Sequence, residues 1–146
     1  MEGIIGIIAF TLGWLLAQLG KCLGVINQKG KHLKPRDILS ALSKSGGMPS
    51  GHTASFVALD TYFGMSLGFA SPIFALAICT TLIFIYDAIN VRYAVGEQGK
   101  VLNSIVSADS RKGKSLRVVE GHTILQVIIG GIVGIAAGLA CFIIFK

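Results

Sequence analysis

Charged residues are scarce in this chain of 146 residues, because Asp, Glu, Lys and Arg together make up only 14%, against about 25% in an average soluble domain. Hydrophobic residues make up 53%, and so few charges could not cover that much apolar surface in water. Proline is also rare, with three residues, whereas glycine is frequent, with nineteen. Small residues of this kind suit closely packed transmembrane helices. We therefore expect one integral membrane domain over residues 1–146 and exclude an ordinary soluble enzyme.

Cysteines are few as well, and their number is odd. Cys22, Cys79 and Cys141 lie in apolar runs without metal-ligand spacing, so we expect small buried hydrophobes rather than disulfides or a metal site. The net charge is +6, but no stripe of basic and aromatic residues accompanies it, which argues against nucleic-acid binding. In a membrane protein this charge is typical of loops near anionic headgroups or of a site for an anionic substrate.

Four apolar runs organise the chain, and they are residues 3–26, 53–70, 72–91 and 123–145. Each has about the length that a helix needs to cross a bilayer. No positive charge precedes the first run, so we expect a retained helix rather than a cleaved signal peptide. The pattern predicts an all-α, polytopic membrane helix bundle of about four transmembrane helices, with a tight turn at Ser71-Pro72.

Two polar segments, residues 27–49 and 92–121, separate these runs, and each contains an amphipathic stretch that predicts a short interfacial helix. With four spans, both segments lie on the same side of the membrane. Nearly all ionisable residues fall there, so the positive-inside rule predicts a multi-pass protein of the cell membrane whose charged face is cytoplasmic.

The strongest local signals are two histidines that each precede an apolar run. They stand in Gly51-His52-Thr53 and Gly121-His122-Thr123. The loop before His52 is rich in glycine, and Pro49 fits the first turn of the following helix. The free N–H groups at the start of a helix attract anions. We therefore expect both histidines beside an anion site on the charged face.

Cations near the two histidines complete a set that suits phosphoryl transfer, and they are Lys21, Arg36, Arg92 and Arg117. Cations and helix N-termini can neutralise phosphate oxygens, one histidine can attack phosphorus, and the other can protonate the leaving group. No carboxylate cluster is present to hold magnesium, so we expect neither a metal nor another cofactor. Asp87 lies in an apolar run and needs a partner. Arg92 is a candidate, although five residues is a poor spacing on an α-helix.

Several blocks in the same order resemble the divergent branch of the type 2 phosphatidic-acid phosphatase superfamily, which is related to acid phosphatases and vanadium haloperoxidases. The blocks are Gln18 to Lys21, Ser45 to His52, Tyr86 to Asn103, and Leu116 to Thr123 with Gly130-Gly131 beyond. The resemblance implies that His122 is the phosphorylated nucleophile and His52 the general acid. It also implies that the phosphate contacts Ser50, the Gly51 amide, Lys21 and Arg117.

Two departures from the superfamily pattern affect these assignments. The superfamily's first motif ends in Arg-Pro, whereas this chain has Pro35-Arg36, so Arg36 is a weaker candidate and Arg92 is the alternative. The position four residues after the nucleophile carries an orienting carboxylate in the superfamily and Gln126 here. Glutamine can hold a ring N–H but cannot stabilise an imidazolium as an anion does. Asp87 or Glu97 could supply that charge from another helix.

The first hypothesis is an integral membrane phosphatase that hydrolyses a lipid phosphate through a phosphohistidine. Phosphatidylglycerol phosphate, phosphatidic acid and an isoprenoid phosphate are the candidate substrates. The alternative is a non-catalytic lipid-phosphate binder or transporter, and a third interpretation is a structural membrane subunit. The glycine stripe Gly130, Gly134 and Gly138 permits close helix contacts. Such contacts suit packing within the chain and a homo-oligomer equally well.

Overall fold

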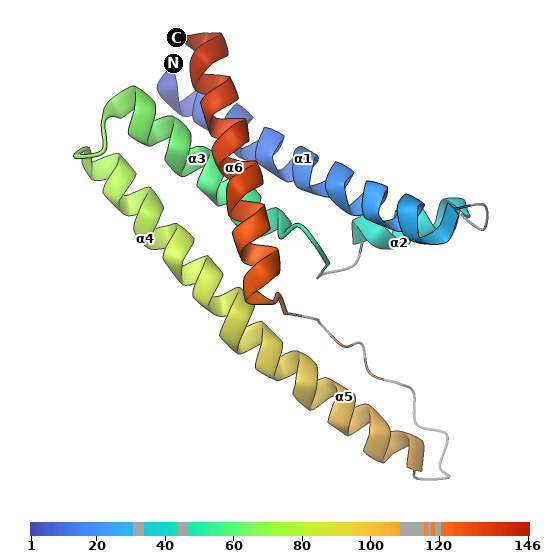
Figure 1. Cartoon of the computed structure of the whole chain (residues 1–146). Helices are drawn as coiled ribbons and strands as arrows, with labels where there is room; N and C mark the ends of the chain where they lie inside the picture. The colour runs from blue at the N-terminus through green and yellow to red at the C-terminus, as the bar shows by residue number, and fades with distance from the viewer. Residues whose placement is uncertain (31–33, 44–46, 109–115, 117, 119–120) are drawn as a thin grey trace.

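The computed structural model of the chain is a bundle of helices (Figure 1). It describes residues 1–30, 34–43, 47–108, 116, 118 and 121–146. Its helices are α1 (Glu2–Lys29), α2 (Pro35–Ser43), α3 (Gly51–Leu67), α4 (Pro72–Tyr86), the π-helical segment η2 (Asp87–Val91), α5 (Arg92–Ala108) and α6 (Ile124–Phe145). No strand occurs among these described residues, and the all-α prediction is confirmed.

The helix α3 lies at the centre of the bundle, against α1, α4 and α6. Its buried residues are mostly small or polar, and Ala54, Ala58 and Ser55 are at most 1% exposed. The surrounding helices carry large apolar side chains on their outer faces, such as Ile7, Ile83 and Ile143. This distribution is the reverse of a soluble protein and fits a bundle whose outer surface faces lipid.

The glycine stripe of α6 is used inside the chain. A Cβ atom added at Gly130, Gly134 or Gly138 would lie 2.5–2.6 Å from a backbone carbonyl oxygen of Ser50, Ala54 or Ala58. The stripe therefore lets the backbones of α6 and α3 approach closely. Because it is occupied by α3, it gives no support for contact with a second copy of the chain, and the homo-oligomer stays a prediction.

Within the described part of the chain, three helices are long and apolar enough to cross a membrane, namely Glu2–Gln28, Pro72–Ser107 and Ile124–Phe145. The expected second span, α3, has 17 residues, which corresponds to about 25 Å. A hydrocarbon core is about 30 Å thick. The helix α3 is short and carries the buried polar residue Asp60, which is 4% exposed.

The polar segment after α4 differs from the prediction. We expected a separate interfacial helix there, but α5 continues from α4 through η2 as one long rod that extends past the bundle (Figure 1). The other predicted short helix is present as α2, which begins at Pro35. The turn at Ser71-Pro72 is also confirmed, since Ser71 caps α4 by accepting a hydrogen bond from the Phe74 N–H at 3.1 Å.

The cysteine prediction is right for one residue of three. Cys141 is buried, whereas Cys22 is half-buried and Cys79 is exposed. Cys79 lies on α4, which packs against the bundle with one face and exposes the other. An apolar run therefore does not by itself place a residue in the core.

The two termini lie side by side at one end of the bundle (Figure 1). There the Tyr62 hydroxyl donates a hydrogen bond of 2.5 Å to the Glu2 carboxylate and ties α3 to the start of α1. The starts of α3 and α6 and the junction of α4 with α5 lie toward the other end. As the topology predicted, both histidine-bearing segments are therefore on the same side of the molecule.

Candidate functional site

His122 is held immediately before the start of α6. It is 6% exposed, and the next residue, Thr123, is the N-cap of the helix. Thr123 and Gln126 form a capping box in which the Thr123 hydroxyl accepts from the Gln126 N–H and the Gln126 side chain accepts from the Thr123 N–H. The backbone N–H of His122 donates to the Ala88 carbonyl at 3.0 Å. The backbone of His122 is thus fixed against the helix that contains Ala88.

The capping box also determines which ring nitrogen of His122 carries the proton. The Thr123 N–H can only donate, so the Gln126 atom that lies 3.1 Å from it must be the carbonyl oxygen Oε1. The same oxygen lies 3.0 Å from Nδ1 of His122. Nδ1 must therefore carry the hydrogen in the neutral ring, and Nε2 keeps its lone pair. This is the tautomer that a nucleophilic histidine needs.

His122 lies outside the membrane-spanning segments, and its surroundings keep it neutral. Burial lowers the pKa of the imidazole below its usual 6.5, and the positive charges of Lys21 and Arg92 act in the same direction. The hydrogen bond to Gln126 opposes them by favouring the protonated ring. The balance leaves the pKa of His122 lowered, so the unprotonated form dominates near neutral pH.

His52 has a different setting at the start of α3. Ser50 is the N-cap, and its hydroxyl accepts hydrogen bonds from the N–H and the hydroxyl of Thr53. His52 is therefore the second residue of the helix, and it is exposed. The prediction that Pro49 occupies the first helical turn is wrong, because capping by Ser50 starts the helix at Gly51.

The structure places Ser50 and Gly51 in the interior. Ser50 is fully buried, and its N–H donates to the Gln126 carbonyl at 3.0 Å. Gly51 is buried and faces Trp14 and Gln18 of α1. The Ser50 hydroxyl thus acts as a helix cap, and its predicted contact with a phosphate stays a prediction. Gln126 links the two histidine-bearing segments, because its side chain holds His122 and its backbone holds Ser50.

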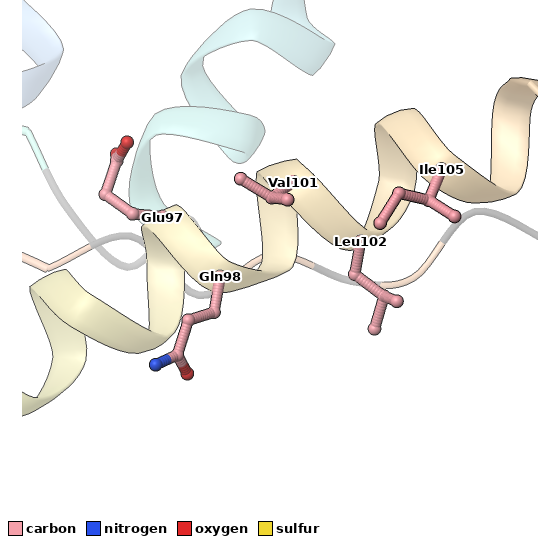
Figure 2. A pocket seen from close by; sticks show the side chains of 5 residues that line it. All are labelled: Glu97, Gln98, Val101, Leu102 and Ile105. Atoms are coloured by element: carbon pink, nitrogen blue, oxygen red, sulfur yellow. The ribbon is translucent and has the colours of Figure 1, made fainter.

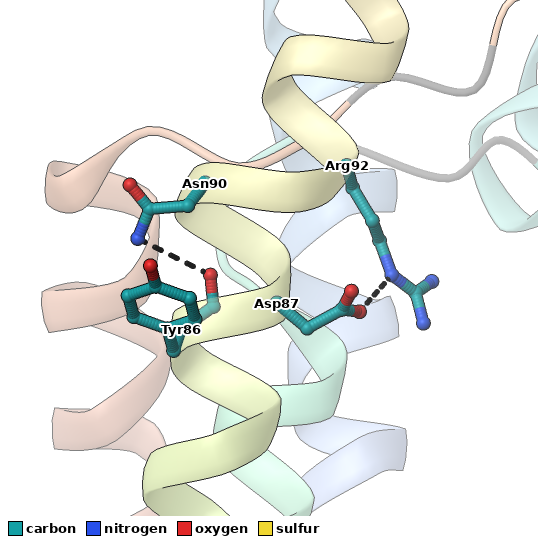
Figure 3. A network of polar contacts seen from close by, with 4 residues as sticks. All are labelled: Tyr86, Asp87, Asn90 and Arg92. Atoms are coloured by element: carbon teal, nitrogen blue, oxygen red, sulfur yellow. Dashed lines mark hydrogen bonds and ion pairs between the residues drawn. The ribbon is translucent and has the colours of Figure 1, made fainter.

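Cationic side chains from two other helices act electrostatically on both histidines. Lys21, half-buried on α1, and Arg92, at the start of α5, lie within electrostatic range of His52 and of His122. Asp87 is within range of His52 as well. The predicted pairing of Asp87 with Arg92 is present, since Arg92 Nε lies 2.5 Å from Asp87 Oδ2 (Figure 3).

Two predicted residues of the described part of the chain, Arg36 and Glu97, are not brought into this group. Arg36 is exposed on α2 and is not among the charges that act on either histidine. Glu97 pairs with Lys100 at 2.7 Å and lies on α5 beside an open apolar groove (Figure 2). Gln126, not Glu97 or Asp87, holds the His122 ring. Arg117 lies outside the described residues.

One part of the site was not singled out from the sequence, and another was named only within a block of the family resemblance. The Ala88 carbonyl accepts the hydrogen bond of the His122 N–H. A pattern of side chains cannot predict which backbone carbonyl will act as an acceptor. Gln18 is 8% exposed, and among the described residues its buried Oε1 has no hydrogen-bond partner beside the start of α3. From the sequence, Gln18 was named only as the start of the block Gln18 to Lys21 and was given no role of its own.

Comparison with known proteins identifies the family of the chain. The model of the Divergent PAP2 family matches residues 5–137. The chain belongs to this family. It is also 33% identical over 111 residues to the uncharacterized membrane protein YuiD of Bacillus subtilis (strain 168), covering 66% of this chain and 70% of that protein. No solved structure matches the chain. Membership in the divergent PAP2 family confirms the predicted resemblance and establishes a phosphatase-related membrane protein.

Proposed function

We propose that this protein is a membrane phosphatase for lipid phosphates, with His122 as nucleophile and His52 as general acid. The observation that carries the proposal is the arrangement around His122. Its Nδ1 is held by Gln126, which leaves the Nε2 lone pair available, and Lys21 and Arg92 lie near enough to act on the ring. A neutral imidazole among cations suits attack on an anionic phosphate.

The proposed reaction has two displacements at phosphorus. In the first, Nε2 of His122 forms a bond to phosphorus while the ester P–O bond breaks, and protonated His52 gives its proton to the departing oxygen. In the second, neutral His52 takes a proton from water, which attacks the phosphohistidine and releases inorganic phosphate. Lys21 and Arg92, with Arg117 by resemblance, neutralise the phosphate oxygens in both steps.

The position of the site supports a lipid substrate. The histidines stand at the ends of helices whose outer faces are apolar, so a substrate can keep its chains in the bilayer while its phosphate reaches the site. Phosphatidylglycerol phosphate, phosphatidic acid and an isoprenoid phosphate all fit. The positive charge of this face favours a cytoplasmic site, and therefore the first two substrates.

Phosphate release from these three lipids by detergent-purified protein tests the proposal. We expect release that persists in EDTA and falls to background in His122→Ala. Release should be retained in His32→Ala, which changes the third histidine of the chain, to which no role is assigned. Lipid labelled with ³²P should transfer its label to the protein as an acid-labile, base-stable adduct, which is absent from His122→Ala. Release that needs a divalent metal, or that survives in His122→Ala, would contradict the mechanism.

A non-catalytic lipid-phosphate binder is the second candidate, and Gln126 is the observation that favours it. An uncharged amide stabilises the imidazolium less than a carboxylate does, so the site could hold a phosphate without turnover. In that case wild-type protein in nanodiscs would bind a lipid phosphate more tightly than the matching uncharged lipid, with no ³²P adduct and no release. Binding should then weaken in Lys21→Ala and Arg92→Ala.

A further inference from the structure

The helical rod formed by α4 and α5 changes its winding at the site. Between Asp87 and Val91 the helix is π-helical, and the Arg92 N–H bonds to the Asp87 carbonyl five residues back. An α-helix would have used the Ala88 carbonyl, four residues back. Single π turns of this kind are frequent at functional sites.

The π turn has a consequence for side chains. Residues five apart face one another in a π-helix, whereas in an α-helix they diverge. Asp87 and Arg92 therefore point to the same side and form their ion pair (Figure 3). On the other side of the same turn, the Asn90 side chain donates to the Tyr86 carbonyl at 3.4 Å. The π turn thus places Arg92 on the same side as Asp87, within electrostatic range of both histidines.

The same turn also receives the backbone of His122. Because the Arg92 N–H is bonded to Asp87, the carbonyl of Ala88 can accept the His122 N–H, at 3.0 Å. Ala88 is 5% exposed, so this hydrogen bond is sheltered from water. One turn of helix therefore sets the position of both an arginine and a histidine of the site.

Gly121 makes this contact sterically feasible. A Cβ atom at Gly121 would lie 2.4 Å from the Tyr93 nitrogen, 2.6 Å from the Tyr93 Cα and 2.9 Å from the Ala88 oxygen. All three are backbone atoms of the rod, which cannot yield as a flexible side chain can. Any larger residue would push the segment that carries His122 away from Ala88.

We propose that the π-helical turn Asp87–Val91 positions His122 against Arg92 for phosphoryl transfer, with the Ala88 carbonyl and Gly121 as the positioning contacts. This inference rests on the function proposed above. Displacing a reacting group by about 1 Å can reduce the rate about 10²-fold. The π turn is then a part of the site that acts through His122 without touching the substrate.

The first test is Gly121→Ala, with Gly131→Ala as the matched control, because a Cβ at Gly131 would have no atom within 4 Å. We expect kcat to fall about 10²-fold in Gly121→Ala, with KM changed much less, and both to stay near wild type in Gly131→Ala. The acid limb of the pH–rate profile should also move up in pH, because a displaced His122 loses the burial that lowers its pKa. Mere loss of folded protein would leave that limb unmoved. Unchanged kcat and an unchanged limb would overturn the proposal.

A second test uses wild-type protein and needs no activity. The His122 amide precedes α6 and has no partner within that helix, so its bond to Ala88 is the hydrogen bond that slows its exchange with deuterium. We expect His122 to be protected as well as the interior of α6, and rapid exchange would overturn the proposal. If that protection is found while wild-type protein releases no phosphate, the phosphatase fails and the positioning contact remains. If phosphate is released and Gly121→Ala is unaffected, only the positioning proposal fails.

Discussion

Gly51-His52-Thr53 and Gly121-His122-Thr123 carry the same three residue types, yet the two helices begin at different positions relative to them. Ser50 caps α3, so His52 falls inside the first turn. Thr123 caps α6, so His122 stays outside that helix. The difference comes from the residues that flank each tripeptide. Ser50, just before Gly51-His52-Thr53, is the N-cap of α3, whereas Gln126, three residues after Thr123, completes a capping box that makes Thr123 the N-cap of α6.

This shift of three positions relative to the N-cap gives the histidines different properties. His52 is exposed, and the described structure gives its ring no hydrogen bond. His122 is buried, with its ring held by Gln126 and its backbone by Ala88. A nucleophile needs a fixed position and one defined tautomer, whereas a residue that gives and takes protons needs access to water and to the leaving group. The comparison thus supports the proposed division of roles.

The largest expected effect is a difference between the two histidine variants in how their activity depends on the leaving group of the substrate. In His52→Ala, hydrolysis of a lipid alkyl phosphate should fall by about 10²–10⁴-fold, the usual contribution of a general acid. An aryl phosphate with an acidic phenol needs no proton on its departing oxygen, so its phosphohistidine should still form at nearly the wild-type rate. His122→Ala should lose both reactions. Equal losses on both substrates in His52→Ala would contradict the general-acid role.

A smaller effect should follow from the group that holds the His122 ring. Gln126→Glu keeps the shape of the side chain and both acceptor contacts, but its negative charge favours the imidazolium and should raise the pKa of His122 by about one unit or more. The wild-type pKa is lowered from 6.5, so the acid limb of kcat/KM should lie below that pH and shift upward in the variant. Gln126→Leu is the control, because it removes the hydrogen bond that raises the pKa and should shift the limb downward. Identical profiles would show that Gln126 does not set the protonation of His122.

The sequence predicted the parts of the fold that depend on apolar length and on turn chemistry. The runs that became α1, α4 and α6, the helix after Pro35 and the turn at Ser71 could be located in this way. The start of α3 was misplaced because Pro49 and Ser50 are both favourable at a helix start. The buried Ser50 hydroxyl caps the helix, so α3 begins after Ser50 and Pro49 stays outside it. The continuity of α5 with α4 was missed because an amphipathic pattern does not say whether a helix bends away at the membrane surface.

The candidate site could be predicted as a list of side chains but not as a geometry. Lys21, His52, Arg92 and His122 were named from their types and positions, and the structure brings them together. The five-residue spacing of Asp87 and Arg92 looked unfavourable for an ion pair because an α-helix was assumed. The π turn brings the two side chains to the same side of the helix, where they pair. Neither the turn nor the Ala88 contact leaves a pattern of residue types, since both are decided by backbone hydrogen bonds.

The smallest effect should come from the residue that fixes the start of α3. Ser50→Ala removes the N-cap and leaves the buried Thr53 hydroxyl without its partner, which should lower the free energy of unfolding by about 1–2 kcal/mol. Thr123→Ala removes an exposed cap and should cost less, about 0.5–1 kcal/mol. Denaturation in detergent can compare them. Because the Ser50 hydroxyl is already engaged and fully buried, KM for a lipid phosphate should change less than twofold in Ser50→Ala. A large rise in KM with unchanged stability would instead mean that this hydroxyl turns toward the phosphate, and that the start of α3 rearranges when substrate binds.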